Sequence, residues 1–322
     1  TKHQGMMPKS WDPFAGRFWH QALAATYLDD PTMLACPSVG VPPTLGTGGQ
    51  TVGVSRDTVE TYKKVLNWLR NEQDTSGAFP VSDPDEPWWA YPNAMTGFAL
   101  MAFFGYGCNE RHPPEFAETV RKAIEHLAGP AQIKTGANAG LVTDRGMLPG
   151  ELYSKCAYVH GIGLMALAAA VRTCEDPDLR RKARDAAVLG IQWVAGQQPW
   201  HGCFNYSGGA VTGKADTSAT GWIYQGVGAC RSAGVSVSSE VMTKAQVFLD
   251  HMAAANGKMG YRWFPPPEGP STADWLDERH TPIGLCIRLL LGESPSSAIV
   301  QNQVNYITGD KYGIPRHIYN FT

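Results

Sequence analysis

A short segment near the C-terminal end of the chain holds the densest group of side chains that could do chemistry. Residues 274–280 read Asp-Trp-Leu-Asp-Glu-Arg-His, so three carboxylates, an arginine and a histidine fall within seven positions. Carboxylates beside aromatic surface lose solvation, which raises their pKa, and a neighbouring histidine exchanges protons near neutral pH. The pattern predicts acid/base chemistry. With one further acid that precedes a helix, the candidate catalytic residues are Asp216, Asp274, Asp277, Glu278 and His280.

Aromatic side chains gather on four connecting segments. Residues 74–92, 128–156, 197–216 and 254–280 each lead into an apolar helix, and together they carry five of the ten tryptophans. Exposed aromatic residues on long loops over a rigid scaffold are typical of binding sites, and converging helix N-termini favour an anionic group such as a diphosphate or a uronate. We therefore expect a ligand site, with candidate binding residues Trp88, Trp89, Tyr91, Tyr158, His160, Trp222, Arg262, Trp263 and Trp275.

Ordinary structural roles remain open for the same residues. Asp216 directly precedes a predicted helix and fits an N-cap. The Thr-Pro pair at 281–282 is a usual helix start, which would leave His280 as the solvent-facing residue before it. His160 lies in a helix without charge, where a hydrogen-bonded core histidine is the commoner arrangement. The segment 274–279 also fits a solvated turn.

The elements that must position these residues follow a repeat. The pattern Trp-x4-Gln-x3-Gly-x-Phe occurs at 68–79 and again at 193–204 with identical spacing, and looser copies run around 124–141 and 248–261. Each copy follows an amphipathic segment and precedes a nearly chargeless one. A glycine recurs in the chargeless segments at intervals of 64, 60 and 63 residues. These segments are 94–105, 157–171, 217–230 and 282–291.

Amphipathic helices alternate along the chain with nearly chargeless helices. This alternation predicts hairpins in which the amphipathic helices lie outside and enclose the chargeless ones. We expect an all-α fold, an α/α toroid of five to six helical hairpins in two concentric rings. An open superhelix is the alternative, but its common periods of about 33 to 47 residues are shorter. We expect a single domain over residues 1–322, with the best-supported repeats at 58–292, an early inner helix at 18–28 and a long loop at 36–53.

Composition excludes several classes of protein. The 322 residues are 43% hydrophobic and 17% charged with a net charge of −2, so disorder and a polynucleotide or anionic-membrane partner are not expected. The longest apolar run, 157–171, is shorter than the roughly 18 residues of a membrane span, so none is predicted. Seven cysteines, three of them in or beside apolar helices, indicate buried thiols rather than a disulfide framework. The chain begins at Thr1, so both a removed leader and a trimmed chain stay open and the localisation stays unknown.

The repeat resembles a known family. The Trp/Gln/Gly/Phe pattern is similar to the QW-type repeat of squalene–hopene cyclases and protein prenyltransferase β subunits. The chain from about 58 to 292 resembles the bacterial prenyltransferase/squalene oxidase repeat proteins. The stretches that carry the resemblance are Tyr-Val-His-Gly-Ile at 158–162, Asp-Thr-Ser-Ala-Thr-Gly-Trp at 216–222 and Thr-Pro-Ile-Gly-Leu-Cys at 281–286. This resemblance implies the toroid and a terpene-cyclase or prenyltransferase ancestry.

The catalytic sets of those families are incomplete in this chain. The place that matches the Asp-x-Asp-Asp-Thr motif of the cyclases reads Gly-Lys-Ala-Asp-Thr at 213–217, which leaves only the carboxylate of Asp216. The frame that matches the zinc ligands of the prenyltransferases gives Asp216, Ser218 and His280, and serine is a poor zinc ligand. Neither a metal nor a cofactor is therefore predicted, unless Cys203 or Cys286 completes the zinc set.

Three functions remain open from the sequence. By resemblance, the first is a cyclase-like or prenyltransferase-like toroid that binds an apolar or isoprenoid ligand in its central cavity and acts on it by acid/base chemistry. The second is a non-catalytic module that binds a peptide, lipid or glycan. The third is a carbohydrate-active toroid, a polysaccharide lyase or glycoside hydrolase analogue, in which tryptophans stack on sugars and two carboxylates act as acid and base.

Overall fold

The described residues form two layers of helices. The computed structural model describes residues 56–80, 91–144, 147–149, 155–208, 215–263, 274–276 and 280–308. Four helices with few charges lie next to one another in sequence order and form the inner layer. They are α3 (Pro92–Gly105), α5 (Cys156–Thr173), α7 (Thr217–Ser232) and α9 (Thr281–Leu290). Each overlaps a chargeless segment predicted from the sequence, so the all-α prediction and the inner helices are confirmed.

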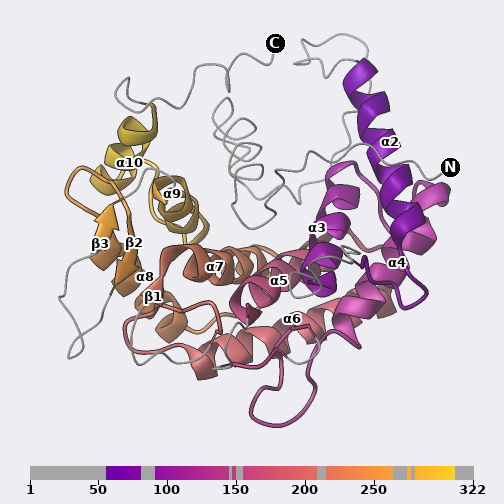
Figure 1. Ribbon diagram of the computed structural model, residues 1–322, viewed down its shortest axis with the longest axis horizontal. Helices are drawn as coiled ribbons and strands as arrows, with labels where there is room; N and C mark the ends of the chain where they lie inside the picture. Colours follow the sequence, from indigo (N-terminus) through magenta and orange to yellow (C-terminus); the bar gives the residue numbers. More distant parts are fainter. Residues whose placement is uncertain are drawn as a thin grey trace, which may run out of the picture.

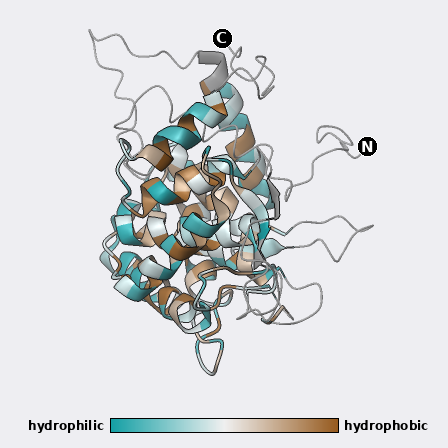
Figure 2. Cartoon of the chain, turned by 90° about the vertical axis from the view of Figure 1, so that its left-hand side faces the viewer, coloured by the Kyte–Doolittle hydropathy of each residue, from teal (hydrophilic) through white to brown (hydrophobic). Residues whose placement is uncertain are grey.

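The outer layer consists of helices with one polar face, which alternate along the chain with the inner ones. They are α2 (Arg56–Glu72), α4 (Pro114–Ala128), α6 (Pro177–Gln197), α8 (Ser239–Met252) and α10 (Ala298–Thr308). Figure 1 shows the two layers as an arc, with α3, α5, α7 and α9 on its inner side and α4, α6, α8 and α10 outside them. Figure 2 views the side that carries α8 and α10, where hydrophilic and hydrophobic residues occur on the same helices. Closure of the arc into a ring, the 18–28 helix and the 36–53 loop lie outside the described residues.

The inner helices run parallel at close range because glycines let their backbones approach. A Cβ at Gly221 would meet the side chain of Ile283, and a Cβ at Gly228, seven residues later, would meet Leu290, also seven residues later. Equal steps in the same direction mean that α7 and α9 are parallel. The recurring glycine of α5, Gly161, likewise faces the backbone of α7. The N-terminal ends of the inner helices therefore lie at one end of the layer, which we call the N-terminal face.

Each connection into an inner helix is fixed to the next outer helix by a glycine with positive φ. Gly140, in the connection from α4 to α5, has a φ of +98°, and a Cβ at this position would overlap the backbone carbonyl of Leu189 in α6. Gly202 has a φ of +74° and faces Lys244 of α8 in the same way. Only glycine meets both demands without strain. The equivalent positions in the other connections are Gly77 and Gly257.

A glutamine before three of these four turns binds the same next outer helix. The Nε2 of Gln73 donates to the carbonyl of Thr119 at 2.9 Å, and the Nε2 of Gln198 donates to that of Val241 at 3.0 Å. Gln132 makes the equivalent bond to Ala186 at 2.8 Å, so the poorly recognised copy at 124–141 is a true repeat. The glutamine of the repeat therefore joins successive hairpins.

The tryptophan of the repeat behaves differently in its two copies. Trp193 is 3% exposed and packs edge-on against His160 with ring centroids 4.5 Å apart. Trp68 is 48% exposed. The tryptophan of the repeat therefore packs in the core at Trp193 and not at Trp68.

A small antiparallel sheet interrupts the helical pattern and was not predicted. Its strands, in the order β1-β2-β3, pair Asp216 with Arg262 and Arg262 with Asp274. The pairing thus places the backbones of three predicted site residues side by side on neighbouring strands. The strands are β1 (Ala215–Asp216), β2 (Gly260–Trp263) and β3 (Asp274–Leu276).

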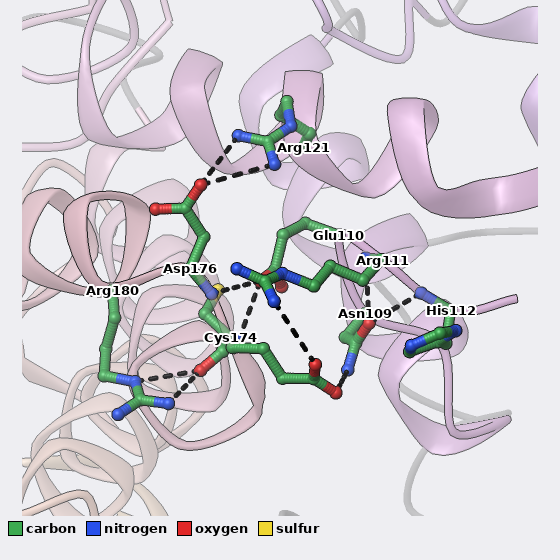
Figure 3. A network of polar contacts seen from close by, with 9 residues as sticks. Asn109, Glu110, Arg111, His112, Arg121, Cys174, Asp176 and Arg180 are labelled. Atoms are coloured by element: carbon green, nitrogen blue, oxygen red, sulfur yellow. Dashed lines mark hydrogen bonds and ion pairs between the residues drawn. The ribbon is translucent and has the colours of Figure 1, made fainter. Parts of the chain in front are cut away.

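A polar network ties the hairpins together at the other end of the inner layer (Figure 3). Glu110, which follows α3, is 3% exposed, and its Oε1 accepts the backbone N–H groups of Glu175 (2.7 Å) and Asp176 (2.5 Å). Asp176 caps α6 by accepting the N–H groups of residues 178 and 179, and it pairs with Arg121 of α4 at 3.3 Å. We assign this network a structural role, since the bonds of Glu110 and the ion pair of Arg121 join one hairpin to the next.

One described helix, α5, is long and apolar enough to cross a membrane, but 78% of its apolar window is buried inside the fold. It is the central helix of the inner layer, between α3 and α7. Its apolar character is therefore explained by burial in the core. The six cysteines of the described residues form no disulfide with one another, and five of them are buried.

Candidate functional site

The N-terminal face brings together residues from the starts of three inner helices. Lys155 is the N-cap residue of α5, Asp216 is that of α7 and His280 is that of α9. Only Asp216 caps its helix with its side chain. Tyrosines from neighbouring segments fill the space between these positions. We call the group of Lys155, Tyr158, Tyr206, Asp216, Ser218, Tyr261, Arg262 and His280 the tyrosine cluster.

Asp216 is held at the centre of the tyrosine cluster by its capping bonds. Its carboxylate is 2% exposed, and Oδ1 accepts the backbone N–H groups of Ser218 (2.8 Å) and Ala219 (3.0 Å) as well as the Ser218 hydroxyl. The other oxygen, Oδ2, is buried and accepts no hydrogen bond of ordinary geometry among the described residues, although the Tyr261 hydroxyl interacts with this carboxylate. The N-cap alternative is therefore confirmed for Oδ1. The cap does not account for the burial of Oδ2, because buried polar atoms are normally hydrogen-bonded.

Three tyrosines surround this carboxylate. The hydroxyl of Tyr158 lies 2.6 Å from that of Ser218, and its ring stacks on Tyr206 with centroids 5.4 Å apart. The hydroxyls of Tyr206 and Tyr261 are 2.7 Å apart. Burial raises the pKa of Tyr158 and of Tyr261, and the negative charge of Asp216 raises both further. The phenols are therefore proton donors at neutral pH and not phenolates.

Cationic side chains lie on the faces of these rings. The Nζ of Lys155 is 3.8 Å from the centroid of the Tyr206 ring, and burial lowers the pKa of this lysine while Asp216 opposes the shift. Arg262 lies over the Tyr261 ring at 5.1 Å, and His280, 8% exposed, stacks on the same ring at 4.7 Å. Such contacts hold cations at aromatic faces. The cluster thus combines one carboxylate with two positive groups and several hydroxyls.

An apolar stripe continues from the cluster along the inner helices. The rings of Phe98 in α3 and Trp222 in α7 meet edge to face at 5.6 Å. Because α6 packs on the outer side of α5, which lies between them, the two rings meet across the inner side of α5. The partly buried residues of this inner stripe recur at helical spacing and are almost all large and apolar. They are Met95, Phe98, Met101, Met165, Ala169, Trp222, Leu285 and Leu289.

His160 does not belong to the site, and its assignment as a binding residue is corrected here. It is 0% exposed; its Nδ1 accepts the backbone N–H of Val142 at 3.0 Å and its Nε2 lies 3.2 Å from the carbonyl of Gly190. In the hairpins on either side, Thr96 and Thr220 accept the equivalent amides, both at 2.9 Å. His160 therefore has the same structural role as the threonines in the neighbouring hairpins. Burial lowers the pKa of His160 to about 3.

The remaining predicted residues divide into two groups. Tyr91 is 3% exposed at the start of α3 and is not one of the tyrosine cluster; burial and, to a smaller extent, the charge of Asp144 raise the pKa of its phenol. Trp263 lies on β2, and Asp274 and Trp275 lie on β3; only the backbone of these three residues is described. Trp88, Trp89, Asp277 and Glu278 lie outside the described residues.

Several residues of the site were missed by reasoning from the sequence. Lys155, Ser218, Tyr206 and Tyr261 were not selected, although two of them share a signal: each of these tyrosines follows its repeat glycine, Gly202 or Gly257, by four residues. The equivalent position after Gly140 is Asp144, which was also missed. An alignment of the repeats on the positive-φ glycine would have identified all three.

The described part of the site contains no metal set. No three His, Cys, Asp or Glu side chains gather there in an arrangement that could hold an ion. The residues of the prenyltransferase frame make other contacts, since Ser218 bonds to Asp216 and Tyr158, and His280 stacks on Tyr261. Cys203 is fully buried, with Sγ 3.6 Å from the carbonyl of His201.

Comparison with known proteins adds no relative. No protein-family model matches the chain, and no curated protein sequence matches it.

Proposed function

We propose that this protein is an α/α toroid that binds an amphiphilic isoprenoid. The apolar chain of the ligand lies along the inner stripe and its polar end lies at the tyrosine cluster. The same proposal includes closure of the arc into a ring and descent from the QW-repeat family that the sequence resembles. Asp216 acts there as the acid/base group.

The inner stripe supports an apolar ligand. Methionine side chains adapt to irregular apolar shapes, and Phe98 and Trp222 add aromatic surface to Met95, Met101 and Met165. These side chains are half-buried, whereas the opposite sides of the same helices are buried against other helices. Contact with an apolar chain would remove the remaining apolar area from water, which is favourable.

The tyrosine cluster supports a polar, anionic end on that ligand. The N-terminal ends of α5, α7 and α9 carry partial positive charge, which favours an anion. Lys155 and Arg262 add two full positive charges. The hydroxyls of the cluster can donate hydrogen bonds to anionic oxygens.

The observation that carries an acid/base role is the state of Asp216. Oδ1 accepts three hydrogen bonds, while Oδ2 is buried without one of ordinary geometry and has the Tyr261 hydroxyl as a neighbouring proton donor. Burial of a carboxylate oxygen that is not fully hydrogen-bonded costs free energy. A ligand proton bound at Oδ2 would recover that cost. This is the position from which a carboxylate can accept or return a proton.

Replacement of Asp216 by asparagine tests this function. Asparagine caps a helix as well as aspartate does, so we expect Asp216→Asn to fold normally and to bind farnesyl diphosphate by calorimetry. We expect its product formation, followed by mass spectrometry, to fall by about 10² to 10⁴-fold relative to the native chain, because the acid/base group is lost.

Asp176→Asn is the matched control, since Asp176 caps α6 with the same two backbone bonds at the other end of the layer. We expect this variant to keep its turnover. Turnover that survives Asp216→Asn would contradict the catalytic role and leave the binding-only function. Absence of any isoprenoid binding would contradict the proposal as a whole.

A further inference from the structure

A second buried acid lies on the N-terminal face, at the start of α3. Asp144 is 3% exposed, and its Oδ1 accepts the backbone N–H of Asn93, in the first turn of α3, at 2.9 Å. Its Oδ2 is buried and has no hydrogen-bond donor among the described residues. Asp144 therefore resembles Asp216, since each acid binds the start of an inner helix with one oxygen and leaves the other unused.

The surroundings of Asp144 contain no cation among the residues that the structure describes. Tyr91 is the nearest titratable neighbour on α3. On the α4 side, His126 reaches Asn93 with Nε2 2.7 Å from Oδ1, and its Nδ1 lies 3.2 Å from the carbonyl of Ser76. Burial lowers the pKa of His126, while the Ser76 carbonyl and Asp74 oppose the shift. Among the residues that the structure describes, no ion pair compensates the charge of the Asp144 carboxylate.

The two acids differ in what holds them. Asp216 accepts three hydrogen bonds on Oδ1 and has Lys155 nearby. Asp144 accepts one N–H and, in the described part of the chain, has no opposite charge beside it. Burial raises the pKa of Asp144 to about 7 although the Asn93 bond opposes the shift. Pairs of acids in unlike surroundings are the usual arrangement for separate acid and base roles.

Both acids lie at the same end of the inner layer. The inner helices are parallel, and α3 and α7 flank α5, so the starts of α3 and α7 lie on either side of the start of α5. The contact between Phe98 and Trp222, one to two turns below these starts, shows that side chains from α3 and α7 meet across α5. A ligand end placed above these two rings has an acid on each side.

We propose that Asp144 is a second proton-carrying group of this site, which donates a hydrogen bond from protonated Oδ2 to the anionic end of the ligand. This inference rests on the proposed function and extends it to the α3 side of the site. The carboxyl keeps its proton in the hydrogen-bonded complex. Ionised Asp144 would instead repel the anion, so binding requires the protonated form.

The pH dependence of binding tests this proposal. A site that must be protonated and has a pKa near 7 loses affinity by about tenfold between pH 6 and pH 8, because the competent fraction falls by that factor. We expect the affinity of the native chain for farnesyl diphosphate to fall between pH 6 and pH 8 by about tenfold more than the affinity of Asp144→Asn falls over the same range. Farnesol, which carries no charge, should show no such difference.

Glu110→Gln is the matched control, because Glu110 is equally buried and also has an oxygen without a partner, but lies at the opposite end of the layer (Figure 3). We expect its pH profile to equal that of the native chain. Asp144→Ser, whose hydroxyl can still accept the Asn93 N–H, replaces Asp144→Asn if the latter fails to fold.

The outcomes separate the two proposals. Farnesyl diphosphate binding with the same pH profile in the native chain and in Asp144→Asn would overturn the role of Asp144 and leave the proposed function intact. Absence of binding at every pH would overturn both. A profile that flattens in Asp144→Asn and not in Glu110→Gln would support the role of Asp144, whatever the effect of Asp216→Asn on turnover.

Discussion

Gly140→Ala is expected to destabilise the fold by roughly 3 to 5 kcal/mol, or to prevent folding altogether. Gly140 has a φ of +98°, where an L-residue is strained, and the added Cβ would overlap the carbonyl of Leu189. Because that atom belongs to the backbone of α6, relief requires the outer helix to move away from the connection. Urea unfolding followed by circular dichroism measures the loss.

Gly136→Ala separates the cost of backbone strain at positive φ from the cost of the overlap with the outer helix. Gly136 lies in the same connection with a φ of +79°, but a Cβ there meets nothing within 4 Å. We expect this variant to lose only the backbone cost of about 1 to 2 kcal/mol. Equal losses in both variants would contradict the close contact between connection and outer helix that repeats through the fold.

His160→Leu is expected to show the second large effect, and its size depends on pH. The change leaves the buried N–H of Val142 without an acceptor, which costs about 1 to 3 kcal/mol, in addition to any misfit of the new side chain. His160→Thr is the matched variant, since threonine accepts the equivalent amide at positions 96 and 220. We expect the threonine variant to be the more stable one if the smaller side chain is accommodated.

The pH dependence reveals the buried histidine itself. The pKa of His160 is about 3 in the folded state, below the roughly 6.5 of an unfolded chain. Below about pH 6.5 the unfolded state therefore binds a proton at this histidine, whereas the folded state does not. The free energy of unfolding falls as the pH falls, by roughly 2 kcal/mol at pH 5. Both variants should lack this part of the acid destabilisation. Parallel stability curves for native chain and variants between pH 8 and pH 5 would show that His160 is not buried in its neutral form.

Much of the architecture could be predicted from the sequence because it depends on residue types at long, regular spacing. The chargeless segments mark the inner helices, and their recurring glycines mark the close approaches, as Gly221 against Ile283 shows. Helices that are mostly buried carry few charges, and the one in the interior of α9, Arg288, is paired with Asp250 and Glu293. Closure into a ring stays a prediction.

The strands and part of the site could not be predicted, for local reasons. Strand β1 has two residues and β3 has three, too short for an alternating pattern. Their pairing, which joins Asp216 to Arg262, depends on contacts between distant segments. Lys155 and Tyr206 lie in ordinary-looking loops and meet only because their hairpins pack side by side.

His160 shows why a single residue type misleads. A histidine on an apolar helix is compatible with binding and with structure, and only the equivalent threonines in the neighbouring hairpins reveal its role. Asp144 shows the reverse case. Nothing near it in the sequence indicates burial, which follows from the contact of its connection with the start of α3.

Photo-crosslinking tests the central claim most directly. A farnesyl diphosphate analogue with a diazirine at the end of its apolar chain is expected to label the inner stripe, at peptides that contain Met95, Phe98, Met165 or Trp222. An excess of farnesyl diphosphate should suppress the labelling. Labels confined to the outer helices, or labels that excess farnesyl diphosphate does not reduce, would contradict an isoprenoid site on the inner side of the fold.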